Sequence, residues 1–238
     1  MDSKTLIQQL YEKSNEDYKA NVVKLGIPKE CSIGVSTGEV RKLAKGIKKS
    51  NALAYELWNS GLHEARLLAV LLFDKKVISL HEIEKLMQDV ISWDLCDHLC
   101  KNLIIKVTGY QALIESWCNS SKTYVKRAGF TLIASSMIHE DVIEEELVRA
   151  YLEMIRLYSD DEREHVKKAV SWALREIGKY DSNYQERALL VAHDFMLGSK
   201  VQQWIGKDAL KELETLVKVD GRKRLISSKS KMGEERNK

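Results

Sequence analysis

Two stretches of the sequence, YVKRAGFTLIASSM at residues 124–137 and HVKKAVSWALREIG at 165–178, align without a gap at a shift of 41 residues. In both, basic residues come first and apolar residues follow at matching positions. EARLLAVLLF at 64–73 and LCDHLCKNLI at 95–104 resemble them more loosely, at shifts nearer 30 residues. A recurring helix pair that cannot bury its apolar face alone stacks on its neighbours. The repeat therefore favours a solenoid of stacked antiparallel helix pairs of the HEAT-like kind, and a plain multi-helix bundle is the alternative.

The composition also favours an all-α chain. Of the 238 residues, 44% are hydrophobic and 31% charged, which is typical of an ordinary globular protein. One proline and twelve glycines are too few for the many turns of an all-β domain. Helical patterns are expected at about 3–13, 15–25, 37–48, 51–59, 62–75, 80–90, 93–107, 109–118, 121–138, 143–159, 162–179, 183–197 and 201–216. Ser36 with Glu39, and Ser79 with Glu82, match the capping-box pattern of a helix start.

The charge is unevenly distributed along the chain. Residues 218–238 hold eight Lys or Arg against three Asp or Glu, so this segment carries +5 and the preceding 217 residues carry −2. We expect a single solenoid domain over 1–217 and a basic, disordered tail over 218–238. Affinity for a polyanion would have to come from a local basic surface or from the tail.

Several classes of site lack sequence support. There is no G-x-G-x-x-G, phosphate-loop or G-x-S-x-G motif for a nucleotide cofactor or a serine hydrolase. Cys96 and Cys100 could form half of a metal site with His98 or Asp97, but no CxxC or HxxxH partner exists elsewhere. Their spacing suits a buried stripe instead. No apolar run is long enough to span a membrane, and four cysteines without a secretory signal predict reduced thiols in a cytoplasm.

The remaining chemistry lies on helices that the repeat would place on the inner side of the stack. Trp93 and Asp97 in WDLCD are four residues apart, hence about one turn apart on one helix face. Trp172 lies in VSWALRE. Cations that can hold phosphates accompany them: Arg66, Lys126, Arg127, Lys168 and Arg175. The alternatives are that tryptophans at helical spacing are core, that Lys and Arg form a solvated face, and that Asp94 or Asp97 complements the helix dipole.

In order, IGVSTGEVRKLAK, ELWNSGLHEARLLA, SWDLCDHLC, YVKRAGF, HVKKAVSWALREIGK and WIGKDALKEL resemble the DNA alkylation repair family of AlkD-like, HEAT-repeat DNA glycosylases. The resemblance covers about residues 15–216. The chain departs from the family pattern at Thr37-Gly38, where a proline is usual at the helix entry. The resemblance implies a single α-solenoid whose concave, basic face cradles duplex DNA, and excision of N3- and N7-alkylated purines such as 3-methyladenine and 7-methylguanine.

Carried over residue by residue, the resemblance implies that Asp97 is the catalytic aspartate and that Trp93 and Trp172 are the tryptophans of the site. Arg127 falls on the phosphate-contacting arginine, and the resemblance implies that Lys168 and Arg175 are its neighbours in DNA contact. The family's mechanism needs neither a metal nor extrusion of the lesion into a pocket. We therefore expect a monomer that acts on alkylated double-stranded DNA without a cofactor, a metal or a membrane. The family also contains non-catalytic paralogues that bind DNA, sometimes branched DNA, and this alternative remains open.

Overall fold

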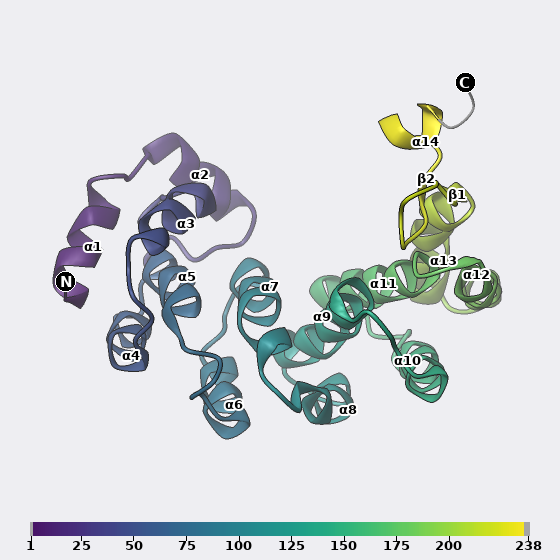
Figure 1. The fold of residues 1–238 in the computed structure, drawn as a ribbon, viewed down its shortest axis with the longest axis horizontal. Coiled ribbons are helices and arrows are strands. Elements are labelled where there is room, and N and C mark those ends of the chain that lie inside the picture. The colour runs from purple at the N-terminus through teal and green to yellow at the C-terminus, as the bar shows by residue number, and fades with distance from the viewer. Residues whose placement is uncertain (1, 236–238) are drawn as a thin grey trace. The chain divides into compact units, whose positions relative to one another are not determined.

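The computed structural model describes residues 2–235, and Figure 1 shows the helices in chain order. The chain forms two compact units, one up to Tyr110 and one from Gln111 onward. The single solenoid domain expected over 1–217 stays a prediction. None of the helices within residues 2–235 is long and apolar enough to cross a membrane.

Unit 1 is made of helices and short joints. Its α-helices are α1 (Ser3–Tyr11), α2 (Glu16–Lys24), α3 (Thr37–Lys45), α4 (Asn51–Asn59), α5 (His63–Leu72), α6 (Leu80–Gln88) and α7 (Trp93–Asn102), and α7 is followed by the 3-10 helix η1 (Ile104–Lys106). Each α-helix lies within a few residues of a predicted one. Ser79 and Glu82 form the predicted capping box at α6, whereas at α3 only the Ser36 half forms, because Glu39 pairs with lysines.

Helix α5 is the centre of unit 1. It contacts α1, α3, α4 and α7, and α3, α5 and α7 lie side by side in one row, with α4 and α6 in a second (Figure 1). All residues of α5 are buried except Arg66 and Leu71, which are partly exposed. A helix covered on nearly all sides must be apolar nearly all round, which explains the run LLAVLL.

Unit 2 repeats this arrangement. Its helices are η2 (Tyr110–Leu113), which begins at the last residue of unit 1, α8 (Ile114–Cys118), α9 (Thr123–His139), α10 (Glu145–Leu157), α11 (Glu164–Gly178), α12 (Ser182–Met196), α13 (Lys200–Leu213) and α14 (Lys231–Glu235). Helix α11 contacts α9 and α13. These three helices form one row, and α8, α10 and α12 form the other (Figure 1). The two stretches with the gapless match therefore become the adjacent helices α9 and α11.

Residues 218–235 differ from the disordered tail that their composition suggests. Strand β1 (Leu216–Val217) pairs antiparallel with β2 (Ile226–Ser227), and α14 follows. Leu225 is 3% exposed, and its backbone N–H donates to the carbonyl of Lys179. The segment is ordered because one buried leucine and a set of long-range polar contacts hold it to unit 2.

Candidate functional site

The start of α7 is fixed by a buried polar network in unit 1. Ser92 is the N-cap residue, but its hydroxyl donates to Asp94 Oδ1 at 2.9 Å instead of capping a backbone N–H. Asp94 Oδ2 lies 2.8 Å from Nε2 of His63 on α5. Burial raises the pKa of Asp94, but the hydrogen bonds from His63, Ser92 and the Leu95 N–H outweigh it, so that the pKa is lowered. Asp94 is therefore a structural carboxylate that ties α7 to α5.

Trp93 and Asp97 lie on one face of α7, as predicted. The Trp93 indole Nε1 donates to the carbonyl of Leu25, just after α2, at 3.0 Å, and this bond fixes the ring. Asp97 is 9% exposed, and Lys101 Nζ, one turn further along α7, lies 3.8 Å from its Oδ2. The α7 face thus holds a partly exposed aromatic ring and a largely buried carboxylate. The ammonium of Lys101 lies near that carboxylate, but beyond hydrogen-bond distance of Oδ2.

Sequence reasoning missed Glu64, which organises the loop before α3. The side chain of Glu64 accepts hydrogen bonds from four donors between 2.7 and 3.2 Å, namely the Ser32 hydroxyl and the backbone N–H groups of Ile33, Gly34 and Val35. The residue is 1% exposed. Glu64 directly precedes ARLLAVLL, a run in which Arg66 is the only polar residue. This position is the signal that could have revealed Glu64, because a carboxylate on a buried helix must be satisfied by hydrogen bonds.

Arg66, which is predicted to bind DNA, donates to backbone carbonyls within unit 1. Its Nε donates to the carbonyl of Trp58 near the end of α4 at 3.1 Å, and its Nη1 donates to the carbonyl of Asp89 after α6 at 3.0 Å. Its guanidinium also lies 5.3 Å from the centre of the Trp58 ring. Arg66 therefore satisfies carbonyls at two helix ends, where a cation is favourable.

In unit 2, Lys126 near the start of α9 is 8% exposed. Its Nζ lies 3.0 Å from Asp161 Oδ2 and 4.3 Å from the centre of the Tyr158 ring. Arg163 donates to both oxygens of the same carboxylate. Hydrogen bonding from Arg163, together with Lys126 and against the effect of burial, lowers the pKa of Asp161 to about 2. Lys126 is thus engaged in a buried ion pair, and neither Asp161 nor Arg163 had been assigned a part in it from the sequence.

Arg127 and Lys168 differ in their exposure. Arg127 is 7% exposed, and its Nη1 donates to the carbonyl of His165 at the start of α11 at 2.8 Å. Lys168 has a side chain that is 54% exposed and pairs with Glu164 one turn earlier at 2.9 Å. Lys168 therefore offers its ammonium to solvent, whereas the guanidinium of Arg127 is held against α11.

Trp172 on α11 is partly exposed, and its indole Nε1 donates to Oε1 of the buried Glu176 at 3.1 Å. Three residues along from Trp172, Arg175 pairs with Glu212 of α13 at 2.9 Å. The carboxylate of Glu176 was not singled out from the sequence, although its place four residues after Trp172 puts it on the same face.

The predicted residues divide between the units: Arg66, Trp93 and Asp97 belong to unit 1, and Lys126, Arg127, Lys168, Trp172 and Arg175 to unit 2. Within residues 2–235, no three His, Cys, Asp or Glu side chains cluster so as to hold a metal. Cys96 and Cys100 form the predicted buried stripe with Leu99 and Leu103. Burial raises the pKa of the Cys118 thiol to about 12, which keeps it protonated.

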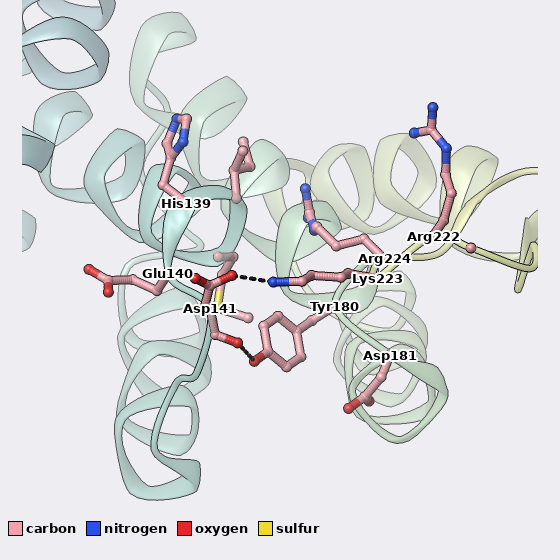
Figure 2. Close-up of a pocket in the computed structure, with 11 residues that line it drawn as sticks. His139, Glu140, Asp141, Tyr180, Asp181, Arg222, Lys223 and Arg224 are labelled. Carbon is pink, nitrogen blue, oxygen red and sulfur yellow. Dashed lines mark hydrogen bonds and ion pairs between the residues drawn. The ribbon is translucent and has the colours of Figure 1, made fainter.

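A pocket of about 750 Å³ lies within unit 2, between the end of α9, the α11–α12 turn and residues 221–224. Figure 2 shows that Lys223 points to Asp141 across it, and that Tyr180 donates to the backbone carbonyl of Asp141. None of the predicted site residues lines this pocket. It was not foreseen, because its walls combine three segments distant in sequence.

Two solved structures resemble this one. A protein from a family related to the HEAT-like repeat DNA glycosylases, with affinity for branched DNA structures, matches 100% of this chain and 94% of its own, with a TM-score of 0.75 and 22% identity. AlkD2 from Streptococcus mutans matches 88% of this chain and 98% of its own, with a TM-score of 0.61 and 22% identity. Both likenesses confirm the predicted HEAT-like all-α fold.

The sequence itself was also compared with known proteins. Among curated proteins none matches it. Residues 6–213, however, match the family described as DNA alkylation repair enzyme. This span runs from the middle of α1 to the last residue of α13 and includes every predicted site residue. The chain therefore belongs to the DNA alkylation repair enzyme family.

Proposed function

We propose that this protein is a DNA glycosylase that removes cationic N3- and N7-alkylated purines from duplex DNA. The observation that carries the proposal is the pair on α7: an indole fixed by its hydrogen bond to Leu25, and the Asp97 carboxylate one turn away. Membership of the DNA alkylation repair family supports it. We further propose that the protein acts as a monomer in the cytoplasm, the reducing compartment that suits its four cysteines.

The chemistry of the substrate explains these residue types. An N3- or N7-alkylated purine carries a positive charge, so its bond to the sugar is already weakened. When that bond breaks, its electron pair goes to the base, which leaves as a neutral molecule and needs no general acid. The sugar is left with oxocarbenium character, and water then adds at C1′ and loses a proton. Stabilisation of the cationic sugar is therefore what the enzyme must supply.

Asp97 would provide that stabilisation with its negative charge and would orient the attacking water. The faces of Trp93 and Trp172 would attract the cationic sugar or base, each by about 0.5–2 kcal/mol. Arg127 would hold a phosphate flanking the lesion. Lys168 and Arg175 would contact the backbone elsewhere, and Arg66 and Lys126 would support the helices that carry the site. Because these roles concern the sugar and the phosphates, the scheme requires neither a metal nor extrusion of the base.

The test is release of N7-methylguanine from duplex DNA under single-turnover conditions. The wild-type protein should release base, and Asp97→Asn should lower the rate by on the order of 100-fold or more while keeping DNA binding. Glu84→Gln is the matched control, since it makes the same carboxylate-to-amide change on an exposed residue of α6 and should leave the rate unchanged. If the folded wild-type protein binds DNA but releases no base, the enzymatic proposal fails.

A second candidate is a non-catalytic protein that binds branched DNA. The burial of Asp97 next to the ammonium of Lys101 favours it, because a paired carboxylate is less available to a cationic sugar. The described affinity of one structural relative for branched DNA points the same way. This candidate predicts tighter binding to a four-way junction than to a linear duplex of equal length, with no base release. Equal affinity for both, with base release, would decide for the glycosylase.

A further inference from the structure

The buried carboxylate of Glu176 joins Trp172 to the last part of the chain. Glu176 is 5% exposed. Its Oε1 accepts from Trp172 Nε1 at 3.1 Å and from Lys179 Nζ at 2.9 Å, and its Oε2 accepts from Arg224 Nη2 at 2.6 Å. The same Arg224 nitrogen donates to the backbone carbonyl of Glu176 at 2.9 Å. Arg224 therefore holds both the side chain and the backbone of the residue that holds the indole.

The fold of residues 216–227 places Arg224 at this point. Next to it, Leu225 is buried and its N–H donates to the carbonyl of Lys179 at the end of α11 at 2.8 Å. On its other side, Lys223 pairs with Asp141 after α9 (Figure 2). The pairing of β1 with β2 closes the loop. Because Leu225 is buried and its N–H is bonded to Lys179, the backbone that carries the guanidinium is fixed beside Glu176.

Removal of Arg224 would take away the donor to Oε2 of the carboxylate. Burial raises the pKa of Glu176, but the positive charges of Lys179 and Arg224 outweigh it and lower the pKa, so that Glu176 is an acceptor at neutral pH. Without Arg224, Lys179 remains, and its Nζ also pairs with Glu212 at 2.7 Å. The carboxylate would then be held only at Oε1, by an ammonium that Glu212 also attracts, and the acceptor of the indole would no longer be fixed from its second oxygen.

We propose that Arg224 is a positioning residue that holds the indole of Trp172, through Glu176, in the orientation used for base excision. The use of that orientation rests on the proposed function, whereas the positioning itself does not. The segment whose composition suggested a disordered tail thereby contributes to the candidate site without contacting the DNA lesion.

The positioning is tested on the full chain labelled with 5-fluorotryptophan, by fluorine NMR, with Trp172→Phe identifying the Trp172 line. Arg224→Met should shift or broaden that line and leave the line of the buried Trp58 in place. Arg222→Met is the matched control, because it removes the same charge from the same segment, and the Arg222 guanidinium contacts Met232 and not Glu176. Arg224→Lys should restore part of the wild-type line, since an ammonium can still reach the carboxylate.

The catalytic consequence is measured separately, as single-turnover release of N7-methylguanine. Arg224→Met should lower the rate by about three- to tenfold relative to Arg222→Met, the loss expected for one misplaced indole, with equal half-saturating DNA concentrations. An unchanged Trp172 line, or an equal effect of Arg222→Met, overturns the positioning. If no protein, wild type included, releases base, the proposed function fails, and the fluorine spectra still decide the role of Arg224.

Discussion

His98 is the neighbour of Asp97 on α7, but it is 7% exposed and its Nε2 lies 3.1 Å from the carbonyl of Leu67. Burial lowers the pKa of His98 from 6.5 to about 4. As the pH falls through this window the unfolded chain binds a proton that the folded chain does not, so the free energy of unfolding should fall, by on the order of 3 kcal/mol at pH 4. His98→Gln can still donate to Leu67 and does not titrate. Urea unfolding from pH 7 to 4 should give a flatter profile for this variant, and parallel profiles would contradict the assignment.

The residues of the candidate site differ in how far sequence could place them. Trp93 and Asp97 share a face because both lie within one helical turn, which spacing alone determines. The ion pair of Lys126 could not be foreseen in this way, because Asp161 lies 35 residues further along the chain. Likewise, the carbonyls that bind Arg66 belong to the ends of two other helices. Residue type identified the cations, and long-range packing decided which of them are exposed.

The contact of α8 with α9 depends on Gly129. A Cβ at this position would lie 2.7 Å from both the backbone nitrogen and the sulfur of Cys118, so Gly129→Ala should force the helices apart and cost about 1–3 kcal/mol. Gly38 in α3 is the matched control, because a Cβ there would meet only Ser36 Oγ at 3.7 Å. Gly38→Ala should stabilise the protein by about 0.5–1 kcal/mol through helix propensity. Both changes are measured by urea unfolding, and a neutral Gly129→Ala would show that the two helices can separate without cost.

The helices were predictable because their signals are local: apolar spacing, and caps such as Ser79 with Glu82. Residues 218–235 carry few such signals. Their order depends on one buried leucine and on the bond of Arg224 to Glu176, 48 residues earlier in the chain. A high density of lysine and arginine is typical of a disordered segment when the pairing of the charges is not considered. The same density is compatible with an ordered segment when the charges pair with carboxylates elsewhere in the unit, as Arg224 does with Glu176.

At the scale of the whole chain, the repeat predicted the fold because self-similarity between α9 and α11 is itself a property of stacked helix pairs. The division after Tyr110 was not predicted, since no change in composition marks it. The charge of −2 on residues 1–217 has a consequence for DNA binding. The proposed binding to DNA would therefore depend on residues 218–238 or on local groups of exposed cations, and so on which lysines and arginines remain available to phosphates.

Lys168 and Lys126 test this dependence, because both are lysines on adjacent helices of unit 2 but only Lys168 is exposed. If Lys168 contacts a phosphate, Lys168→Met should reduce the slope of log K against log salt by about one, since one fewer counterion is released. Lys126→Met should leave the slope unchanged and lower the free energy of unfolding, because it leaves Asp161 with one cation fewer in a buried setting. Fluorescence anisotropy with a labelled duplex between about 50 and 200 mM salt measures this slope over a range in which the affinity changes strongly. An unchanged slope for Lys168→Met would mean that Lys168 contacts no phosphate, and a reduced slope for Lys126→Met would mean that the pair of Lys126 with Asp161 opens when DNA binds.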